Sequence, residues 1–503
     1  MENNFRDMIN PQHTLKRIGS IRTNYVLLAL LILSGFTHIW NAAEFPDIFF
    51  DEGVYMRRAM HVLSGLGPQE ASFYDHPFFG QIFLASILGL IGFPNSFHPS
   101  ASTDSISTLY LAPRVIMGIL TIVDTLLIFK IAENRYGSRV ALISSLLFAV
   151  MPITWLTRRI LLDSILLPFL LLSILLALRS KNSKHQNLTI ILSAVCLGLA
   201  IFTKIPVFTM IPLVAGIIYF NNEKRPKLVG LWLLPVILIP LLWPLQSLET
   251  GHFNLWIQGV LYQTQRFSYG LPSISYFFFQ IDPVLFILGI AGIAFCIAKK
   301  DYFILMWFIP FIIFLLAIGY NQYFYWIPVL PVFCISASVL IARALGLVKR
   351  EKLNKTLPIA VVLGIGVFGL VSTVLLISTD MTSAEFQATS FVLQNVKDDD
   401  NETTILASPS YSWIFNYVFH KQNVLIDYSL ILFQPMETKK VLLVADPHFL
   451  IDIGRGAQLQ EIYNDTKTVA AFDGNVLKYD TSLYPYSSLK VNYEGSHIEI
   501  REK

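Results

Sequence analysis

Residues 187–221 read NLTIILSAVCLGLAIFTKIPVFTMIPLVAGIIYFN and contain a single charged side chain, Lys204. On either side of it lie the apolar runs 187–203 and 205–221. A helix needs roughly 17 to 25 predominantly apolar residues to cross a bilayer, so each run is long enough. The segment therefore predicts two adjacent membrane-spanning helices that meet at Lys204.

The composition of the whole chain extends this conclusion. Of its 503 residues, 54% are hydrophobic and 14% are charged, whereas about a quarter of a soluble protein is charged. A net charge of +3 is too small to indicate a nucleic-acid partner. The three cysteines lie inside apolar runs, which argues against a disulfide framework or a thiolate metal site. We predict an integral, multi-pass membrane protein with no nucleic-acid partner.

Apolar runs of this length recur until about residue 380. We predict eleven transmembrane helices, at about 24–43, 112–131, 139–156, 162–178, 187–203, 205–221, 228–245, 282–298, 302–319, 324–342 and 357–379. The expected fold class is an all-α polytopic membrane bundle followed by a small C-terminal α/β domain.

The distribution of Lys and Arg predicts the orientation. One set of helix ends holds 20 of these residues and the opposite set holds seven. Because cytoplasmic loops carry the excess of positive charge, the N-terminus is expected in the cytoplasm. With eleven spans, the C-terminal domain then lies outside the cell membrane.

Two domains are predicted. Residues 1–380 form the transmembrane domain, with a large outer loop at 44–111 in which the short apolar piece 79–93 is expected to lie in the interface as a helix. Residues 381–503 form the extracytoplasmic α/β domain. Its expected strands are Thr404–Ser408, Val424–Asp427 and Val441–Asp446, and its expected helices are 384–396 and 411–419.

Adjacent carboxylates open the outer loop. Asp51-Glu52 follows an apolar Ile-Phe-Phe run and precedes Gly53. Such a pair can supply a general base together with a positioning or metal-binding group. It can equally cap the start of a helix at 53–63, and the sequence leaves both interpretations open.

A second polar group is Tyr74-Asp75-His76-Pro77. Proline disfavours the helical conformation of the residue before it, so Asp75 and His76 are expected on a rigid corner before the 79–93 helix. The alternative is a turn that only starts this helix.

Cations at the outer helix ends need a reason, because charges at membrane depth are costly. Arg158-Arg159 and then Asp163 stand between two apolar runs with almost no loop. Lys204 needs a counter-charge, and a lipid phosphate at headgroup level would provide it, with Arg114 sharing the role. The alternatives are arginines that only anchor the helices and an ion pair of Lys204 or Arg114 with Asp163.

The order of these motifs resembles the glycosyltransferase-C superfamily, specifically the protein O-mannosyltransferases of glycosyltransferase family 39 and the related aminoarabinose transferases. In that family an Asp-Glu pair opens a long outer loop and a His-Pro or Lys-Pro corner follows. Here these are Asp51-Glu52 and His76-Pro77, and Arg114 matches the arginine that starts the second span.

Three further motifs carry the resemblance, which covers about residues 24–345. One is a Tyr-rich segment, Tyr320 to Pro331, that resembles the family's Tyr-Leu-Leu-Pro stretch. The family's Arg-x-x-Leu-Leu-Asp-Ser segment is matched by Arg159-Ile-Leu-Leu-Asp163-Ser164, with one residue fewer. Its Thr-Lys pair is matched by Thr203-Lys204. The chain departs from the family in reading His-Pro-Phe-Phe at the corner and in lacking the lumenal sugar-binding repeats of eukaryotic members.

The resemblance implies a membrane mannosyltransferase-like enzyme. It would move a mannose-like sugar from a polyprenyl-phosphate donor, such as dolichyl-phosphate mannose, to a hydroxyl of a protein or lipid acceptor, with inversion. The implied roles are general base for Asp51, positioning for Glu52, donor-phosphate binding for Arg114, Arg159, Lys204 and Arg58, and a sugar or acceptor pocket for Asp75, His76 and Asp163.

A divalent cation is the one cofactor considered, with Glu52, Asp75 and Asp163 as candidate ligands. The competing class is a polytopic transporter or flippase for a lipid-linked or polar solute. The charges predicted at one membrane face, rather than at the midplane, favour the enzyme.

Overall fold

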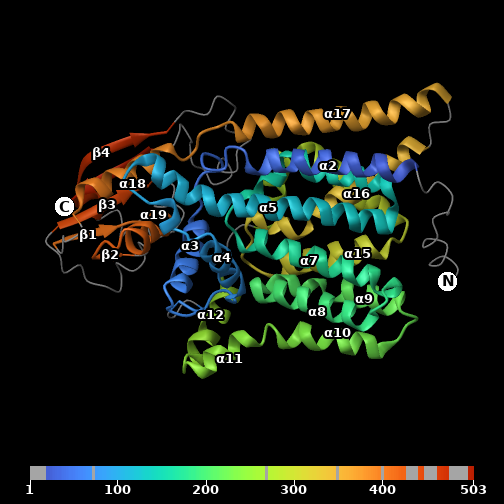
Figure 1. The fold of residues 1–503 in the computed structure, drawn as a ribbon, viewed down its shortest axis with the longest axis horizontal. Coiled ribbons are helices and arrows are strands. Elements are labelled where there is room, and N and C mark those ends of the chain that lie inside the picture. Colours follow the sequence, from blue (N-terminus) through green and yellow to red (C-terminus); the bar gives the residue numbers. More distant parts are fainter. Residues whose placement is uncertain are drawn as a thin grey trace.

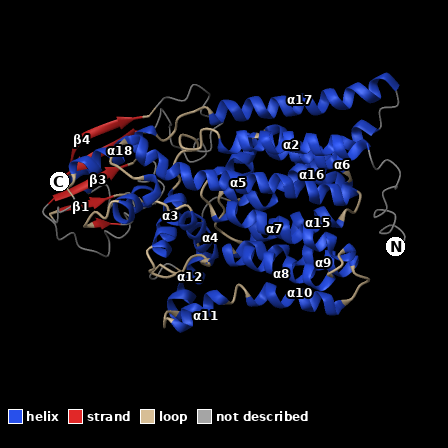
Figure 2. Ribbon diagram, in the orientation of Figure 1, coloured by secondary structure: helices blue, strands red, loops and turns tan. Residues whose placement is uncertain are grey.

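The computed structural model is elongated, with a bundle of roughly parallel helices along most of its length and a small sheet at one end (Figure 1). Outside this sheet the secondary structure is helical (Figure 2). The structure describes residues 18–70, 74–266, 270–346, 351–397, 402–425, 440–446, 462–474 and 497–503.

Strongly apolar helices form the bundle, as residence in a membrane requires. They are α2 (Ile18–Ile39), α5 (Thr103–Tyr136), α6 (Ser138–Val150), α7 (Leu162–Arg179), α8 (Gln186–Thr203), α9 (Ile211–Asn221), α10 (Pro226–Leu238), α14 (Pro283–Ala298), α15 (Tyr302–Ala317), α16 (Leu330–Gly346) and α17 (Glu351–Ile377).

Short 3₁₀ segments interrupt or extend several of these helices. They are η2 (Pro152–Arg158), η3 (Ser180–Asn182), η4 (Ile205–Met210) and η5 (Tyr323–Val329). Both η2 and η4 carry a proline in their first turn. Since proline lacks the N–H that a continuing helix needs, the preceding helices end before it.

Each of the eleven predicted segments falls on a helix or on a helix with its 3₁₀ neighbour, except 228–245, which covers α10 and the start of the next helix. Within the described residues, however, six helices are long and apolar enough to cross a membrane, or up to eight if two bent pairs each form one span. The pairs are α6 with η2 and α14 with α15. The structure thus has the helices of a multi-pass membrane protein, and the number of eleven crossings stays a prediction.

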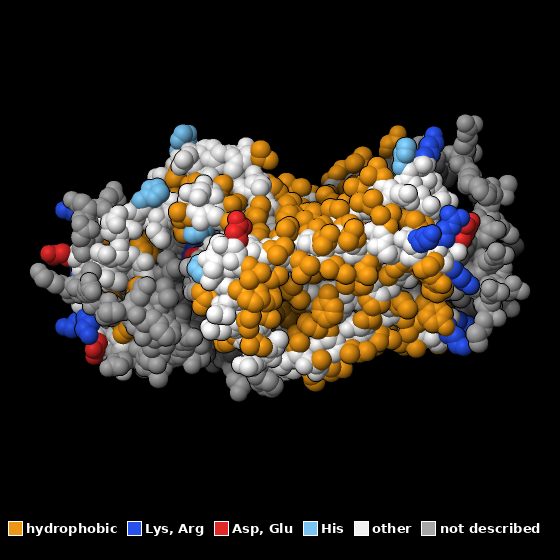
Figure 3. Space-filling model, turned by 90° about the horizontal axis from the view of Figure 1, so that it is seen from below, with side chains coloured by type: hydrophobic (Ala, Val, Ile, Leu, Met, Phe, Trp, Pro, Cys, Tyr) orange, Lys and Arg blue, Asp and Glu red, His pale blue; other side chains and the backbone are white. Residues whose placement is uncertain are grey.

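Hydrophobic side chains cover the middle of the bundle as a broad belt between two more polar ends (Figure 3). The apolar helices at the edge of the bundle are the least buried. Only 17% of the most apolar stretch of α17 is buried inside the protein. The same fraction is buried in the span Pro226–Glu249, which contains α10 and α11 (Leu242–Glu249). Such a surface is suited to contact with lipid.

The short helices α3 (Phe50–Leu63) and α4 (Phe79–Leu90) lie between the bundle and the sheet (Figure 1). The other short helices outside the bundle are η1 (Asn95–Phe97), α11, α12 (Phe253–Gln265) and α13 (Leu271–Ile281). The helices expected at 53–63 and 79–93 are confirmed as α3 and α4. With 12 residues, α4 is too short to cross a bilayer alone.

The C-terminal region is a small α/β unit, as predicted. Its elements are α18 (Ser383–Asn395), α19 (Pro409–Trp413), the π-helix η6 (Ile414–Val418), β1 (Thr403–Leu406), β2 (Val424–Leu425), β3 (Lys440–Ala445), β4 (Lys467–Asp473) and β5 (His497–Glu502). The strand order is β2-β1-β3-β5-β4. The first three strands are parallel, and β5 runs antiparallel to both β3 and β4.

The three expected strands correspond to β1, β2 and β3, whereas β4 and β5 were not predicted. In β4 the residues are exposed or half-buried, and in β5 only Ile498 and Ile500 are buried, so both strands give a weak hydrophobic signal in the sequence.

Two large apolar cores divide the molecule. The first fills the membrane bundle. The second joins α3, α4 and the first half of α5 to α18, α19 and the sheet. The division of the chain at residue 380 stays a prediction, because this second core contains residues from both sides of it. The site described below lies where the two cores meet.

Candidate active site

The adjacent carboxylates Asp51 and Glu52 stand in the first turn of α3. Successive residues of an α-helix point about 100° apart, so the two side chains face different surroundings. The backbone N–H of Phe49 donates to Oε2 of Glu52 at 2.9 Å, which completes the start of the helix. Glu52 thus helps to cap α3 from its third position, but it is buried rather than solvated and the N-cap residue is Phe49.

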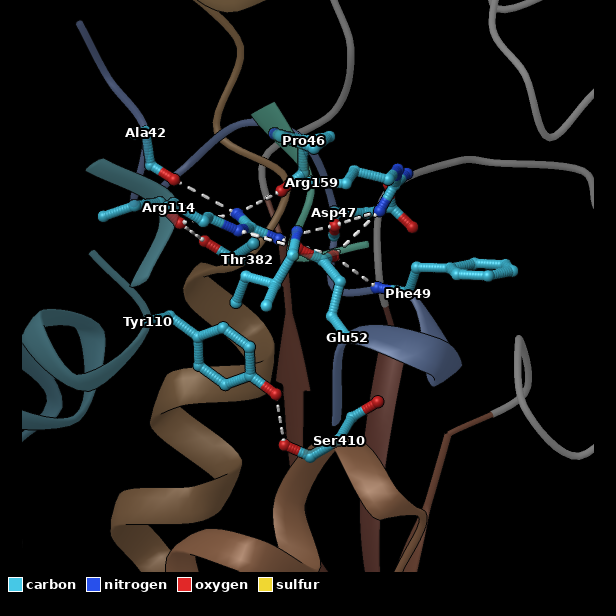
Figure 4. A network of polar contacts seen from close by, with 12 residues as sticks. Ala42, Pro46, Asp47, Phe49, Glu52, Tyr110, Arg114, Arg159, Thr382 and Ser410 are labelled. Carbon is cyan, nitrogen blue, oxygen red and sulfur yellow. Dashed lines mark hydrogen bonds and ion pairs between the residues drawn. The ribbon is translucent and has the colours of Figure 1, made fainter. Parts of the chain in front are cut away.

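Glu52 lies at the centre of a fully buried ion-pair network (Figure 4). Nε and Nη2 of Arg114 donate to its two carboxylate oxygens at 3.2 and 3.0 Å. Nη1 of Arg159 donates to Oε2 at 3.0 Å, and the N–H of Ile160 donates to Oε1 at 3.0 Å. Burial raises the pKa of Glu52, but Arg114 and Arg159 together lower it by a larger amount. The pKa of Glu52 therefore lies below its ordinary value. Glu52 is therefore ionised and saturated with donors.

The two arginines also bind the connection that leads into α3. Arg114 donates to the carbonyl oxygens of Pro46 at 2.6 Å and of Asp47 at 2.8 Å. Arg159 pairs with the carboxylate of Asp47. We call Asp47, Glu52, Arg114 and Arg159 the buried charge cluster. Sequence reasoning did not single out Asp47, and its position just before the apolar Ile48-Phe49-Phe50 run was the available signal.

Asp51 faces the opposite way, into a cavity of about 120 Å³. The lining residues come from one face of α3, the corner before α4, and positions after α8, after α12 and around η5: Phe50, Asp51, Val54, Tyr55, Asp75, His76, Lys204, Arg266, Tyr320, Phe324 and Tyr325. Within the described part of the chain, no side-chain or backbone donor is hydrogen-bonded to the Asp51 carboxylate. Burial raises its pKa to about 6, against the opposing effect of Lys204 and Arg266.

Two cations line the cavity with Asp51. Lys204 follows the last turn of α8 in extended conformation, and its Nζ lies 2.6 Å from Oδ2 of Asp163. This Nζ also lies 4.3 Å from the centre of the Tyr325 ring. Arg266 follows α12 and stacks on Tyr320 at 3.7 Å. The ion pair of Lys204 with Asp163, one of the two alternatives in the sequence, is thus present.

The corner before α4 supplies the remaining polar groups. Asp75 and His76 both line the cavity, and Nη2 of Arg58 lies 2.7 Å from Oδ1 of Asp75. Burial lowers the pKa of His76 to about 3, so its imidazole is neutral at pH 7. Burial raises the pKa of Asp75, but the opposing effect, mainly of Arg58, is larger. The pKa of Asp75 therefore lies below its ordinary value, and this carboxylate is ionised.

The structure therefore separates the predicted site residues into two groups. Those that line the cavity are Asp51, Asp75, His76 and Lys204, and those that stand behind it are Glu52, Arg58, Arg114, Arg159 and Asp163. The roles assigned to both groups stay predictions. From the sequence, Arg266 is placed in the outer loop 246–281 as part of a lid or acceptor surface and is given no role in binding the donor phosphate.

The three candidate ligands of a divalent cation do not converge. Glu52 is paired with two arginines, Asp75 with Arg58, and Asp163 with Lys204. Within the described ranges, no group of three or more His, Cys, Asp or Glu side chains is arranged to hold a metal ion. These carboxylates do not fit a metal centre, because cations of the protein already neutralise them; the predicted divalent cation stays untested.

This chain is similar to known proteins in part of its sequence and in its fold. The family model of dolichyl-phosphate-mannose-protein mannosyltransferases matches residues 28–255. The structure of ArnT from Cupriavidus metallidurans bound to undecaprenyl phosphate superposes with a TM-score of 0.59 at 12% identity, over 95% of this chain and 97% of that one. A search of curated protein sequences found no match.

A second similar structure is the oligosaccharyltransferase AglB from Archaeoglobus fulgidus, in complex with an inhibitory peptide and a dolichol-phosphate. Its TM-score is 0.53 at 12% identity, over 85% of this chain and 70% of that one. Residues 28–255 are thus similar to the dolichyl-phosphate-mannose-protein mannosyltransferases, and the chain shares its fold with ArnT and AglB. None of these matches favours the transporter alternative.

Proposed function

We propose that this enzyme transfers a mannose-like sugar from a polyprenyl-phosphate donor to a hydroxyl of a protein or lipid acceptor at the extracytoplasmic face of the cell membrane. The observation that carries the proposal is the carboxylate of Asp51. It stands free of hydrogen bonds within the described residues, in a cavity that also holds two cations.

Asp51 is the general base of the proposed reaction. The acceptor oxygen attacks the anomeric carbon, its proton passes to Asp51, and the bond from that carbon to the phosphate oxygen breaks with its electron pair leaving on the phosphate. Direct displacement inverts the anomeric carbon. A base with a pKa of about 6 is largely ionised at pH 7. Its pKa is also near the working pH, so it can accept a proton efficiently.

Lys204 and Arg266 stabilise the charge that develops on the departing phosphate, because both line the same cavity as Asp51. Preformed cations in a site that excludes water act strongly on such charge. Neutral His76 and the tyrosines of the cavity offer hydrogen bonds to sugar hydroxyls. In this assignment Arg114 and Arg159 do not touch the donor but hold Glu52.

The donor class is supported by the similar structures, since ArnT was solved with undecaprenyl phosphate and AglB with a dolichol-phosphate. The orientation is supported by the excess of Lys and Arg at one set of helix ends. With the N-terminus in the cytoplasm, the cavity and the sheet both lie outside, where lipid carriers rather than nucleotides supply activated sugars.

The test uses the purified protein in nanodiscs, offered a panel of polyprenyl-phosphate sugars with candidate acceptors. Release of polyprenyl phosphate is followed for the wild type, for Asp51→Asn, and for Asp104→Asn, an exposed acidic residue of the same outer loop. Loss of a general base costs about 10²–10⁴-fold, so Asp51→Asn should lose at least hundredfold while Asp104→Asn stays at the wild-type rate. Full activity of Asp51→Asn would remove the base assignment.

A further inference from the structure

The helix that carries Asp51 makes direct backbone contact with the C-terminal α/β unit. A Cβ atom added to Gly53 would lie 2.4 Å from the carbonyl carbon and oxygen of Pro409 and from the nitrogen of Ser410. No side chain larger than that of glycine fits there. The first turn of α3 is therefore pressed against the first turn of α19, two residues after Asp51.

A hydrogen bond from α5 holds this contact in place. The hydroxyl of Tyr110 donates to the carbonyl oxygen of Ser410 at 2.6 Å, and Nε1 of Trp413 donates to the same hydroxyl at 3.1 Å. Figure 4 shows Tyr110 reaching Ser410 beside the network around Glu52. One turn along α5 from Tyr110, Arg114 binds Glu52. A single helix thus fixes two consecutive residues of α3, Glu52 directly and Gly53 through Ser410.

The other residues of α3 also face either the α/β unit or the cavity. Met56, Ala59 and Met60 are buried in the apolar core shared with the sheet. Asp51 and Tyr55 line the cavity. Any displacement of α19 relative to the bundle is therefore passed through the packed face of α3 to the carboxylate of Asp51.

We infer that Gly53 and Tyr110 are positioning residues, through which the α/β unit sets the orientation of Asp51 in the cavity. The inference rests on the proposed function, since it concerns the base of that reaction. Displacing a reacting group by about 1 Å can cost roughly hundredfold in rate. The contact therefore acts on the rate of the chemical step and on the environment of Asp51 rather than on donor affinity.

The test compares Gly53→Ala and Tyr110→Phe with a matched control, Gly292→Ala. A Cβ atom added to Gly292 would also lie 2.4 Å from a backbone carbonyl carbon and oxygen, those of Ser336. This contact, however, lies inside the membrane bundle, between α14 and α16. For each variant, kcat, the donor KM and the pH midpoint of kcat are measured on protein that elutes as a folded, monodisperse species.

We expect Gly53→Ala to lower kcat about tenfold or more, and Tyr110→Phe about threefold, with donor KM within about twofold of the wild type. Both should move the pH midpoint, because the surroundings of Asp51 change, while folded Gly292→Ala keeps the wild-type values. Wild-type kcat and pH midpoint in the folded Gly53→Ala and Tyr110→Phe proteins would overturn the inference. If Gly53→Ala does not fold, Tyr110→Phe decides alone.

Hydrogen exchange of α3 separates this inference from the proposed function. Faster exchange of residues 50–56 in Gly53→Ala or Tyr110→Phe, and not in Gly292→Ala, supports the positioning contact even if the wild type releases nothing from any donor. Unchanged exchange in α3 overturns it. Silence of the wild type towards all donors, by contrast, contradicts only the proposed function.

Discussion

Asp51 and Glu52 are neighbours in the sequence and have the same chemistry, yet they lie in opposite settings. Glu52 is fully buried and accepts hydrogen bonds from two arginines and two backbone N–H groups. Asp51 lines a cavity, and nothing in the described part of the chain donates to its carboxylate. The difference arises because one helix turn directs adjacent side chains to different sides of α3.

The comparison separates charges that hold the structure from charges that remain available for chemistry. A carboxylate whose lone pairs are all engaged cannot accept a proton from a substrate without losing partners, and each lost partner costs free energy. The buried charge cluster therefore fixes the entry into α3. In the cavity, Lys204 is paired with Asp163, whereas no cation of the described residues is paired with Asp51.

The largest effect is expected when Glu52 is removed. In Glu52→Ala the guanidinium groups of Arg114 and Arg159 stay buried with less compensation, and breaking a buried ion pair typically costs about 3–5 kcal/mol. We expect a loss of this size in the free energy of unfolding, measured by denaturation in detergent, together with a low yield of folded protein.

The matched change is Asp51→Asn, which breaks no hydrogen bond to the carboxylate within the described residues. It should leave the denaturation midpoint at or above that of the wild type, since a carboxylate whose pKa is raised by burial is easier to bury when neutral. Equal destabilisation by both variants would contradict the division into two settings.

The pH dependence of transfer gives the next largest effect. The pKa of Asp51 is raised to about 6, and a base must be deprotonated to act. We expect kcat to be constant above pH 7 and to fall about tenfold per pH unit below pH 6, hence about hundredfold at pH 4. The measurement is donor cleavage over about pH 3.5–8 with a check of folded protein at each end.

A midpoint near pH 4, where an ordinary aspartate titrates, would show that Asp51 is more solvated than its cavity indicates. The assignment to Asp51 is checked by Asp51→Glu, whose midpoint should differ from that of the wild type.

Much of this arrangement was accessible from the sequence. Apolar runs located the bundle helices, and proline and charge located the corner with Asp75 and His76. The sequence could not tell which arginine faces which carboxylate. Arg114 and Glu52 are 62 residues apart, and their pairing depends on how α5 packs against α3.

The same limit explains the arginines assigned to the donor phosphate. A cation at an outer helix end has the same sequence signal whether it binds a lipid phosphate or a carboxylate of the protein. Only the fold shows that Arg114 and Arg159 both bind Glu52, while Arg266, from a distant loop, reaches the cavity. The strands β4 and β5 were missed because their pattern is only partly apolar.

A smaller effect is expected when an arginine of the cavity is replaced. Arg266→Met removes a cation from the cavity but leaves the Glu52 network intact. We expect kcat to fall about tenfold, less than for loss of a fully enclosed donor because Arg266 is only half-buried, with an unchanged denaturation midpoint. The matched substitution is Arg114→Met, which removes an arginine of the buried charge cluster. It should lower stability instead, with a large loss of folded protein. Destabilisation by Arg266→Met would place it with the structural charges.

The smallest effect concerns the aromatic wall of the cavity. Nζ of Lys204 lies 4.3 Å from the Tyr325 ring centre and 4.7 Å from that of Phe324. Contacts of this kind are worth about 0.5–1 kcal/mol at exposed sites and about 2 kcal/mol when desolvated, and the lower figure is expected here because the Phe324 ring stays against Lys204 when Tyr325 is replaced. Tyr325→Leu should therefore raise the donor KM about two- to fivefold, because Lys204 is held less firmly towards the phosphate, whereas Tyr325→Phe keeps the ring and should stay closer to the wild type. If the two variants were equally impaired, the Tyr325 hydroxyl rather than its ring would be the group that matters, and Tyr325 would belong with the residues that bind the sugar.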